Sequence, residues 1–145
     1  EVLFTEVLRR HAQRSGEALT GWLAAAADPA VGRALAALHR RPGHSWTVEE
    51  LAEEAGLSRS SLAERFTRSL GRSPMSYLFD WRMEIAAAGL RDGTRSVIDL
   101  ATDLGYESES AFHRAFKRRF GEPPGRYRRQ QRISPGDAGA APRAQ

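Results

Sequence analysis

The hydrophobic positions of the chain recur every three or four residues, which is the period of an amphipathic helix. Residues 2–11 and 30–41 show this most plainly, because their large apolar side chains fall on one stripe. No segment alternates apolar and polar residues with the period of two that a half-buried strand shows. The pattern therefore predicts an all-α fold.

Residues that start and stop helices divide this pattern into separate elements. Thr47 and Glu50 have the spacing of a capping box, in which each side chain accepts a hydrogen bond from the backbone amide of the other residue. Pro29 and Pro74 each follow an N-cap residue, and glycines follow most of the apolar runs. These signals predict about seven helices, at residues 29–41, 47–55, 58–70, 74–91, 96–104, 108–120 and 123–129.

The chain contains one pattern twice, in residues 48–77 and 97–127. Each copy has a small residue in a short helix, a glycine at the turn and apolar residues on both sides, as a helix-turn-helix requires. Each copy then ends in Gly-x-x-Pro-x-x-Tyr. The matching pairs are Val48 with Val97, Leu51 with Leu100, Ala52 with Ala101, Gly56 with Gly105, Leu62 with Phe112, Phe66 with Phe116, Gly71 with Gly121, Pro74 with Pro124 and Tyr77 with Tyr127. One copy alone would fit a generic helical hairpin equally well, but two copies in register favour helix-turn-helix units.

The second copy carries a longer motif, A-x-x-L-G-Y-x-S-x-x-x-F-x-R-x-F-K-x-x-F-G-x-x-P-x-x-Y-R, from Ala101 to Arg128. On this motif the chain resembles the DNA-binding domain of AraC-type transcriptional regulators, over residues 28–133. The resemblance implies two homeodomain-like helix-turn-helix subdomains whose second helices enter successive major grooves on one face of DNA. The implied units are a first helix-turn-helix at 47–71, a linker helix at 74–91 and a second helix-turn-helix at 96–120. The grooves lie ~34 Å apart, a span that a ~27 Å linker helix flanked by two subdomains can bridge.

Charge is unevenly distributed along the chain. The formal net charge is +4, and arginine supplies all but one of the 22 basic residues. Residues 114–132 contain eight basic residues and the single acid Glu122. Such a cluster suits a polyanion. A solvated helix face, and the arginine bias of a GC-rich genome, are the alternatives.

The sequence offers no set of residues that an enzyme needs. Its four histidines are scattered, and no Gly-rich phosphate loop, H-E-x-x-H or G-x-S-x-G occurs. The absence of cysteine excludes disulfides, thiolate zinc sites and thiol nucleophiles, including the chemistry of alkylation-repair proteins with an AraC-like domain. No apolar run approaches the ~18 residues of a membrane span. We therefore expect no enzyme, cofactor, metal or membrane association, and a reducing cytoplasm fits the lack of cysteine.

The helix at 108–120 is the richer of the two candidate recognition helices. It buries its phenylalanines and, by position in the family motif, directs four residues to the bases. Arginine can pair with guanine through two hydrogen bonds, and glutamate can accept from cytosine. The base-reading candidates are Glu109, Ser110, His113 and Arg114. Arg114 could instead contact the DNA backbone, and His113 could be an exposed residue without a role.

The corresponding face of the first copy is poorer in groups that read bases. Its base-reading candidates are Ser60, Ser61, Ala63 and Glu64. Ala63 can meet only a thymine methyl group, and Glu64 has the wrong sign for phosphate. Many family members carry longer polar or basic residues here, so this departure weakens the case for direct readout by the first unit.

Other residues are expected to contact phosphates, which fix position without reading sequence. Tyr77 and Tyr127 follow a proline at a helix start, where a hydroxyl and free amides can clamp a phosphate; packing in the core is their alternative. Arg82 on the linker helix is assigned a structural ion pair. The phosphate candidates are Arg59, Arg68, Tyr77, Lys117, Arg118, Tyr127 and Arg129.

The two ends of the chain do not match the repeated unit. Residues 1–27 are expected to be terminal helices of an N-terminal effector or dimerisation domain, often a cupin barrel in this family, through which an effector ligand would act. Residues 134–145 lack periodicity and are predicted to be a disordered tail.

These observations predict a sequence-specific regulator of transcription that binds double-stranded promoter or operator DNA. We expect it in the bacterial cytoplasm, associated with the nucleoid and with RNA polymerase. The alternative is a basic helical module that binds nucleic acid without sequence preference, or binds an acidic protein.

Overall fold

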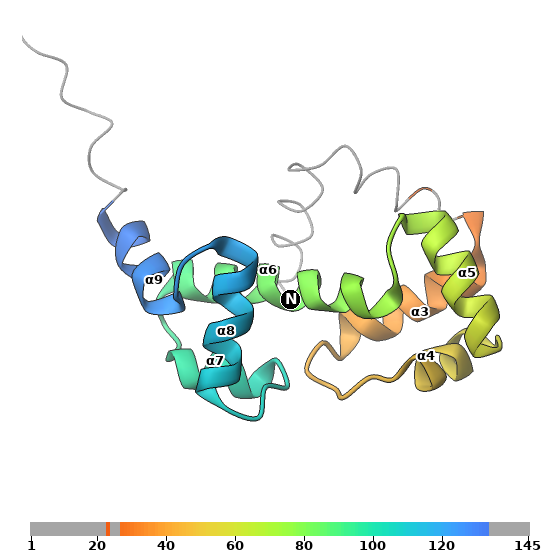
Figure 1. Cartoon of the computed structure of the whole chain (residues 1–145), viewed down its shortest axis with the longest axis horizontal. Helices are drawn as coiled ribbons and strands as arrows, with labels where there is room; N and C mark the ends of the chain where they lie inside the picture. The colour runs from red at the N-terminus through yellow and green to blue at the C-terminus, as the bar shows by residue number, and fades with distance from the viewer. Residues whose placement is uncertain (1–22, 24–26, 134–145) are drawn as a thin grey trace, which may run out of the picture.

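Seven helices make up the part of the chain that this computed structural model describes, which is residue 23 and residues 27–133 (Figure 1). No strand occurs among those residues, so the predicted all-α fold is confirmed. The helices are α3 (Pro29–Arg40), α4 (Val48–Ala55), α5 (Arg59–Leu70), α6 (Pro74–Asp92), α7 (Val97–Asp103), α8 (Glu109–Phe120) and α9 (Pro124–Ile133). The predictions for residues 1–27 and 134–145 lie almost wholly outside the described residues.

Side-chain caps set the helix starts that the sequence predicts. The capping box at α4 is complete: the Glu50 amide donates to the Thr47 hydroxyl and the Thr47 amide donates to the Glu50 carboxylate, each at 3.1 Å. A serine hydroxyl accepts from the amide three residues on at the start of α5, α6, α7 and α8. Each such cap stabilises its helix by about 1 kcal/mol relative to alanine.

The long helix α6 runs along the length of the molecule and joins two groups of helices (Figure 1). Helices α3, α4 and α5 gather at its N-terminal end, and α7, α8 and α9 gather at its C-terminal end. None of the described helices is both long and apolar enough to traverse a membrane.

Each group of helices has its own core, and α6 contributes to both. Leu78, near the N-terminal end of α6, packs with the buried residues of α3, α4 and α5. Met83 and Leu90, farther along the same helix, pack with α7 and α8. The two helix-turn-helix units therefore share one continuous helix as a wall of their cores.

The turn between the two helices has the same construction in both units. Ala52 and Ala101 are buried where the second helix crosses the first, with 2% and 1% of their surface exposed. Gly56 and Gly105 take left-handed backbone conformations, with φ of +70° and +83°. A side chain at either position would be strained, which explains why both copies have glycine there.

Candidate nucleic-acid interface

Helices α5 and α8 belong to the two groups of helices that α6 joins, and each is the second helix of its unit (Figure 1). The predicted base-reading residues recur at three- and four-residue spacing along these helices, so on each helix they share one face. Most of them are exposed, and only Ser61 and His113 are half-buried. The structure thus places both sets of candidates at the surface, one set in each unit.

Most polar groups on α5 already have partners within the chain. Arg68 forms an ion pair with Glu64, one turn earlier on the same helix. The Ser61 hydroxyl accepts from Ser58 at 2.9 Å. Arg59 is exposed and makes no ion pair or hydrogen bond through its side chain to any described residue. Arg59 is therefore the cation on this helix that is most available to a phosphate.

Arg65 ties α5 to the start of α3. Its Nε and Nη2 atoms donate to the two carboxylate oxygens of Asp28 at 2.9 and 2.7 Å. Asp28 also caps α3, because one of its oxygens accepts from the amides of Ala30 and Val31. The hydrogen bond from Arg65 lowers the pKa of Asp28 below its ordinary value. Arg65 consequently positions α5 rather than facing outward.

The exposed face of α8 has cations without partners. Arg114 and Lys117 are exposed, and neither side chain bonds to another described residue. His113 lies with its Nε2 atom 3.4 Å from a carboxylate oxygen of Glu109, one turn earlier. The first two turns of α8 therefore present a carboxylate and a guanidinium that are able to address base edges. The His113 Nε2 atom is buried and makes no hydrogen bond to a described residue.

The next two arginines of α8 turn toward α6. The Arg118 guanidinium lies 4.5 Å from the centre of the Phe79 ring. Arg119 approaches the carboxylates of Asp80 and Glu84 at 3.4 and 3.3 Å. These contacts hold α8 against the middle of α6. A phosphate contact by Arg118 stays a prediction, and it would compete with this packing.

The paired tyrosines of the two units both have internal partners. The Tyr77 hydroxyl lies 2.6 Å from His39 Nε2, and the Tyr127 hydroxyl accepts from Arg91 Nη1 at 2.8 Å. The rings pack in the cores, and burial raises the pKa of Tyr77 to about 12. These contacts favour the core-packing alternative, and a phosphate clamp by either hydroxyl stays a prediction.

Sequence reasoning missed the role of His39. The residue is buried in the first unit and follows Leu35 by four positions, so it lies on the apolar stripe of α3. That placement was the available signal, since a histidine on such a stripe needs a polar partner inside the core. Tyr77 provides one.

Arg82 is structural, but not through the expected ion pair. Its Nε atom donates to the carbonyl of Pro42 at 2.7 Å, and its Nη2 atom donates to the carbonyl of His44 at 2.8 Å. The acceptors are backbone carbonyls of the segment between α3 and α4. Both carbonyls lie outside the helices and so take no part in helical hydrogen bonding. The His44 carbonyl also accepts from the amide of Trp46 at 2.8 Å.

The remaining basic residues divide into paired and unpaired groups. Arg126 lies 3.7 Å from Glu122, and Arg128 donates to the carbonyl of Arg95. Arg129 and Arg132 are exposed and make no side-chain bond to another described residue. With Arg114 and Lys117, they are the part of the basic cluster that is open to a polyanion.

The geometry defines a tandem helix-turn-helix domain, with two similar units mounted on one helix and an exposed second helix in each. A family model described as a helix-turn-helix domain matches residues 51–130. The chain belongs to the AraC-type helix-turn-helix family, as its motif predicts. The matched domain is the DNA-binding domain of transcription regulators and not an enzyme domain.

Relatives from several bacteria carry the same domain. The chain is 49% identical over 128 residues to an AraC-like transcription regulator of Streptomyces lividans, covering 88% of this chain and 42% of that protein. It is 37% identical over 129 residues to the regulator AlkR of Acinetobacter baylyi, covering 89% of this chain and 42% of the relative. The chain thus spans about two-fifths of the length of these curated relatives.

Solved structures show the same arrangement of helices. The DNA-binding domain of AdpA, solved in complex with a target DNA, matches with a TM-score of 0.67 and 30% identity, covering 73% of this chain and 95% of that one. The C-terminal domain of AraT, a response regulator from Geobacillus stearothermophilus, matches with a TM-score of 0.66 and 31% identity, covering 70% and 85%. The predicted pair of helix-turn-helix subdomains is confirmed by these likenesses.

Proposed function

We propose that this chain is the part of a bacterial transcription regulator that binds double-stranded DNA in a sequence-specific manner. Helices α5 and α8 would enter successive major grooves. The observation that carries this proposal is the tandem of exposed second helices on one shared helix, in a chain whose structural relative AdpA was solved with its target DNA.

The two helices would contribute differently to binding. On α8, Arg114 and Glu109 would read bases, and a good two-bond pair of arginine with guanine is worth about 1–3 kcal/mol of discrimination. Lys117 and Arg129 would neutralise phosphates. On α5, Ser60, Ser61, Ala63 and Glu64 remain the base-reading candidates, with Arg59 and Arg68 at the backbone. Binding energy from phosphates would be shared by all sequences, whereas α8 would supply most of the selectivity.

Selection of binding sites from random duplex DNA tests this function. We expect enrichment of an asymmetric site of about 20 base pairs, with two contacted segments one helical turn apart. The preferred duplex should be retained over a scrambled duplex of equal length at ~150 mM salt, where sequence-independent binding is already weak. Equal retention of both duplexes would contradict the proposal and support a sequence-blind basic module.

The same proposal extends to the other domain of the regulator, to RNA polymerase and to the location in the cell. Residues 28–133 would form the DNA-binding domain, and residues 1–27 would belong to an effector or dimerisation domain that responds to a ligand. The regulator would act on RNA polymerase at the promoter, in the cytoplasm at the nucleoid. Transcription in vitro from a promoter that carries the selected site, with and without the regulator, tests the polymerase step; unchanged transcript levels would contradict it.

A further inference from the structure

The loop before α4 touches the turn before α8, and only glycine backbone fits between them. A Cβ atom added to Gly43 would lie 2.0 Å from the carbonyl oxygen of Asp103. A Cβ atom added to Gly105 would lie 2.5 Å from the carbonyl oxygen of Gly43. Both obstacles are backbone atoms, which cannot rotate away as a side chain can. The first unit and the second unit are therefore in direct contact here, away from the helix that joins them.

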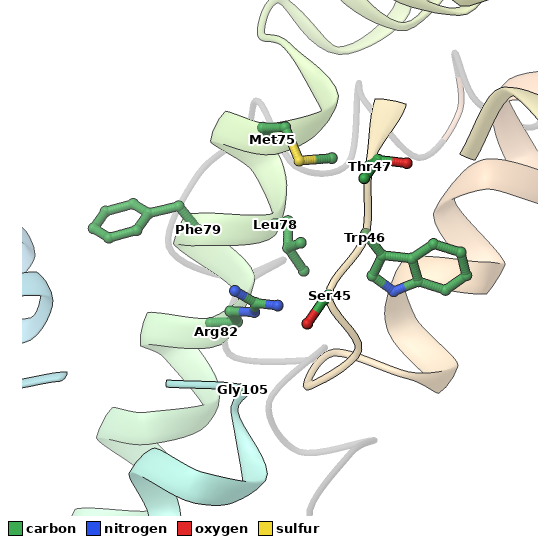
Figure 2. Close-up of a pocket in the computed structure, with 8 residues that line it drawn as sticks. All are labelled: Ser45, Trp46, Thr47, Met75, Leu78, Phe79, Arg82 and Gly105. Carbon is green, nitrogen blue, oxygen red and sulfur yellow. The ribbon is translucent and has the colours of Figure 1, made fainter. Parts of the chain in front are cut away.

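Arg82 reaches into the same contact from α6. In Figure 2 its guanidinium lies between the loop segment of Ser45 and Trp46 and the turn at Gly105. The two carbonyls that it binds belong to the loop of the first unit. Its guanidinium also lies 5.9 Å from the ring centre of Tyr106, in the turn of the second unit. One side chain thus contacts both units at once.

The loop on one side of this contact is itself held in shape. The indole Nε1 of Trp46 donates to the carbonyl of Arg41 at 2.8 Å, and Trp46 is buried in the first core. An open pocket of about 420 Å³ lies beside the contact, with Trp46, Arg82 and Gly105 among the residues that line it. The loop can therefore transmit a displacement to the first unit.

The contact between Gly43 and Gly105 is a second connection between the two units, and it restricts the bending of α6. A helix of 19 residues fixes the separation of two bodies mounted on it, but gentle bending still alters the angle between them. A contact away from the helix axis opposes that bending, because any change of angle would drive the Gly43 and Gly105 backbones together or pull Arg82 from its carbonyls.

We propose that Arg82, with the contact between Gly43 and Gly105, is a positioning device that fixes the angle between α5 and α8. It thereby determines which spacing of the two half-sites on DNA the protein accepts. The claim about spacing rests on the proposed function, whereas the claim about the angle concerns the protein alone.

The angle can be measured without DNA. Because the sequence contains no cysteine, the pair Glu53→Cys and Gln130→Cys, on exposed positions of α4 and α9, allows clean spin labelling. We expect a narrow distance distribution in this parent and a broader or displaced one when Arg82→Ala or Gly43→Ala is added. Arg82→Lys, which keeps the charge but not the two-armed donor, should lie between them. Circular dichroism should show the same helix content throughout.

Arg33→Ala is the matched control for these variants. Arg33 also donates to a backbone carbonyl, that of Ala55 at 2.8 Å, but within the first unit. It should leave the distance distribution as in the parent. A distribution for Arg82→Ala that superimposes on the parent distribution would overturn the proposal.

The claim about half-site spacing is tested by measuring affinity for the selected duplex and for duplexes with one or two base pairs inserted or deleted between the half-sites. We expect Arg82→Ala to weaken binding at the preferred spacing by about 10-fold, through a lower effective concentration of the second unit. Its affinity for an isolated half-site should not change, and its discrimination among spacings should fall. An equal loss on half-site and full site would contradict a positioning role. If the parent shows no sequence preference, the proposed function fails, and the spin-label distances still decide the claim about the angle.

Discussion

Most charged side chains of α5, in the first unit, form ion pairs with other described residues. Helix α8, in the second unit, exposes cations that form no such pair. Arg68 pairs with Glu64 and Arg65 with Asp28 in the first unit. Arg114 and Lys117 have no such partner among the described residues of the second. Two units with the same backbone arrangement can therefore differ in how strongly they attract DNA, because that attraction depends on whether the side chains of the exposed helix are already paired.

The cores of the two units differ as well. The first is built mainly from leucine and alanine around Phe66 and Trp46. The second contains a run of aromatic rings in which Phe116 lies 6.0, 4.6 and 5.3 Å from the centres of Phe112, Phe120 and Tyr127. The unit that exposes more charge is thus held by the more aromatic core.

The largest expected effect comes from removing the central ring of that core. Phe116→Ala should lower the free energy of unfolding by about 3–5 kcal/mol, because a fully buried ring is replaced by a cavity. Phe66→Ala is the matched change in the first unit and should cost less, since among the described residues Phe66 has one close ring neighbour, Tyr77, at 5.8 Å. Denaturant unfolding followed by circular dichroism measures both. A smaller loss for Phe116→Ala would contradict the proposed difference between the cores.

The next effect concerns base reading by α8. Arg114→Ala should weaken binding to the selected site by about 1–3 kcal/mol and relax base preference at one or two positions. Arg129→Ala should instead lower the affinity for all duplexes alike. It should also reduce the slope of log affinity against log salt concentration by the amount expected for about one phosphate contact. Titrations on the selected site and on variants with single base changes separate these outcomes. Equal effects of the two substitutions on every duplex would contradict the roles assigned to them.

The paired tyrosines give a smaller effect that separates packing from DNA contact. Tyr77→Phe should lower the free energy of unfolding by about 0.5–1.5 kcal/mol through loss of the hydrogen bond with His39. Affinity for DNA and its salt dependence should not change. Tyr127→Phe, which loses the bond from Arg91, is the matched variant in the second unit. A fall in salt dependence for either variant would support the phosphate clamp.

Alkaline titration checks the same tyrosine. Burial raises the pKa of Tyr77 to about 12, above the ordinary value of 10.0. Between these values the folded chain keeps a proton that the unfolded chain loses, so the free energy of unfolding should fall as the pH rises through this window. Tyr77→Phe should remove this part of the pH dependence.

The smallest effect tests whether the charge matching on α5 restrains binding. Glu64→Gln should lower the free energy of unfolding by no more than about 0.5 kcal/mol, because the pair with Arg68 is exposed. Affinity for all duplexes should rise as Arg68 becomes available to a phosphate. The slope of log affinity against log salt concentration should steepen by the amount expected for about one phosphate contact. The matched change Glu109→Gln on α8 should alter base preference, and a change in base preference for Glu64→Gln would support base reading by Glu64 as well. No gain for Glu64→Gln would argue that α5 already contacts phosphate through Arg68.

The sequence was sufficient for features that are determined locally. The capping box at Thr47 and the glycines at the two turns follow from short-range geometry, and each is present where the pattern predicts it. The internal repeat then located the two helix-turn-helix units. The exposed positions of α5 and α8 followed from helical periodicity once the phenylalanines were assigned to the core.

Contacts between segments far apart in the chain could not be predicted in this way. The bond between His39 and Tyr77 joins residues 38 positions apart, and the bond from Arg82 to Pro42 joins residues 40 positions apart. Arg119 belongs to the basic cluster of residues 114–132, and no local pattern reveals that Asp80 and Glu84 of α6 lie beside it. Such pairings depend on how the units meet, which periodicity within one helix does not encode.

Because α6 forms a wall of both cores, the two units cannot lose their order independently. Unfolding of either unit removes the packing from half of α6, and an isolated half of that helix would be marginal in water. The molecule should therefore unfold in one cooperative transition. For the same reason, a duplex bound by one unit alone should slow amide hydrogen exchange in the other unit. Binding at the first half-site would then make the unit that reads the second half-site more rigid.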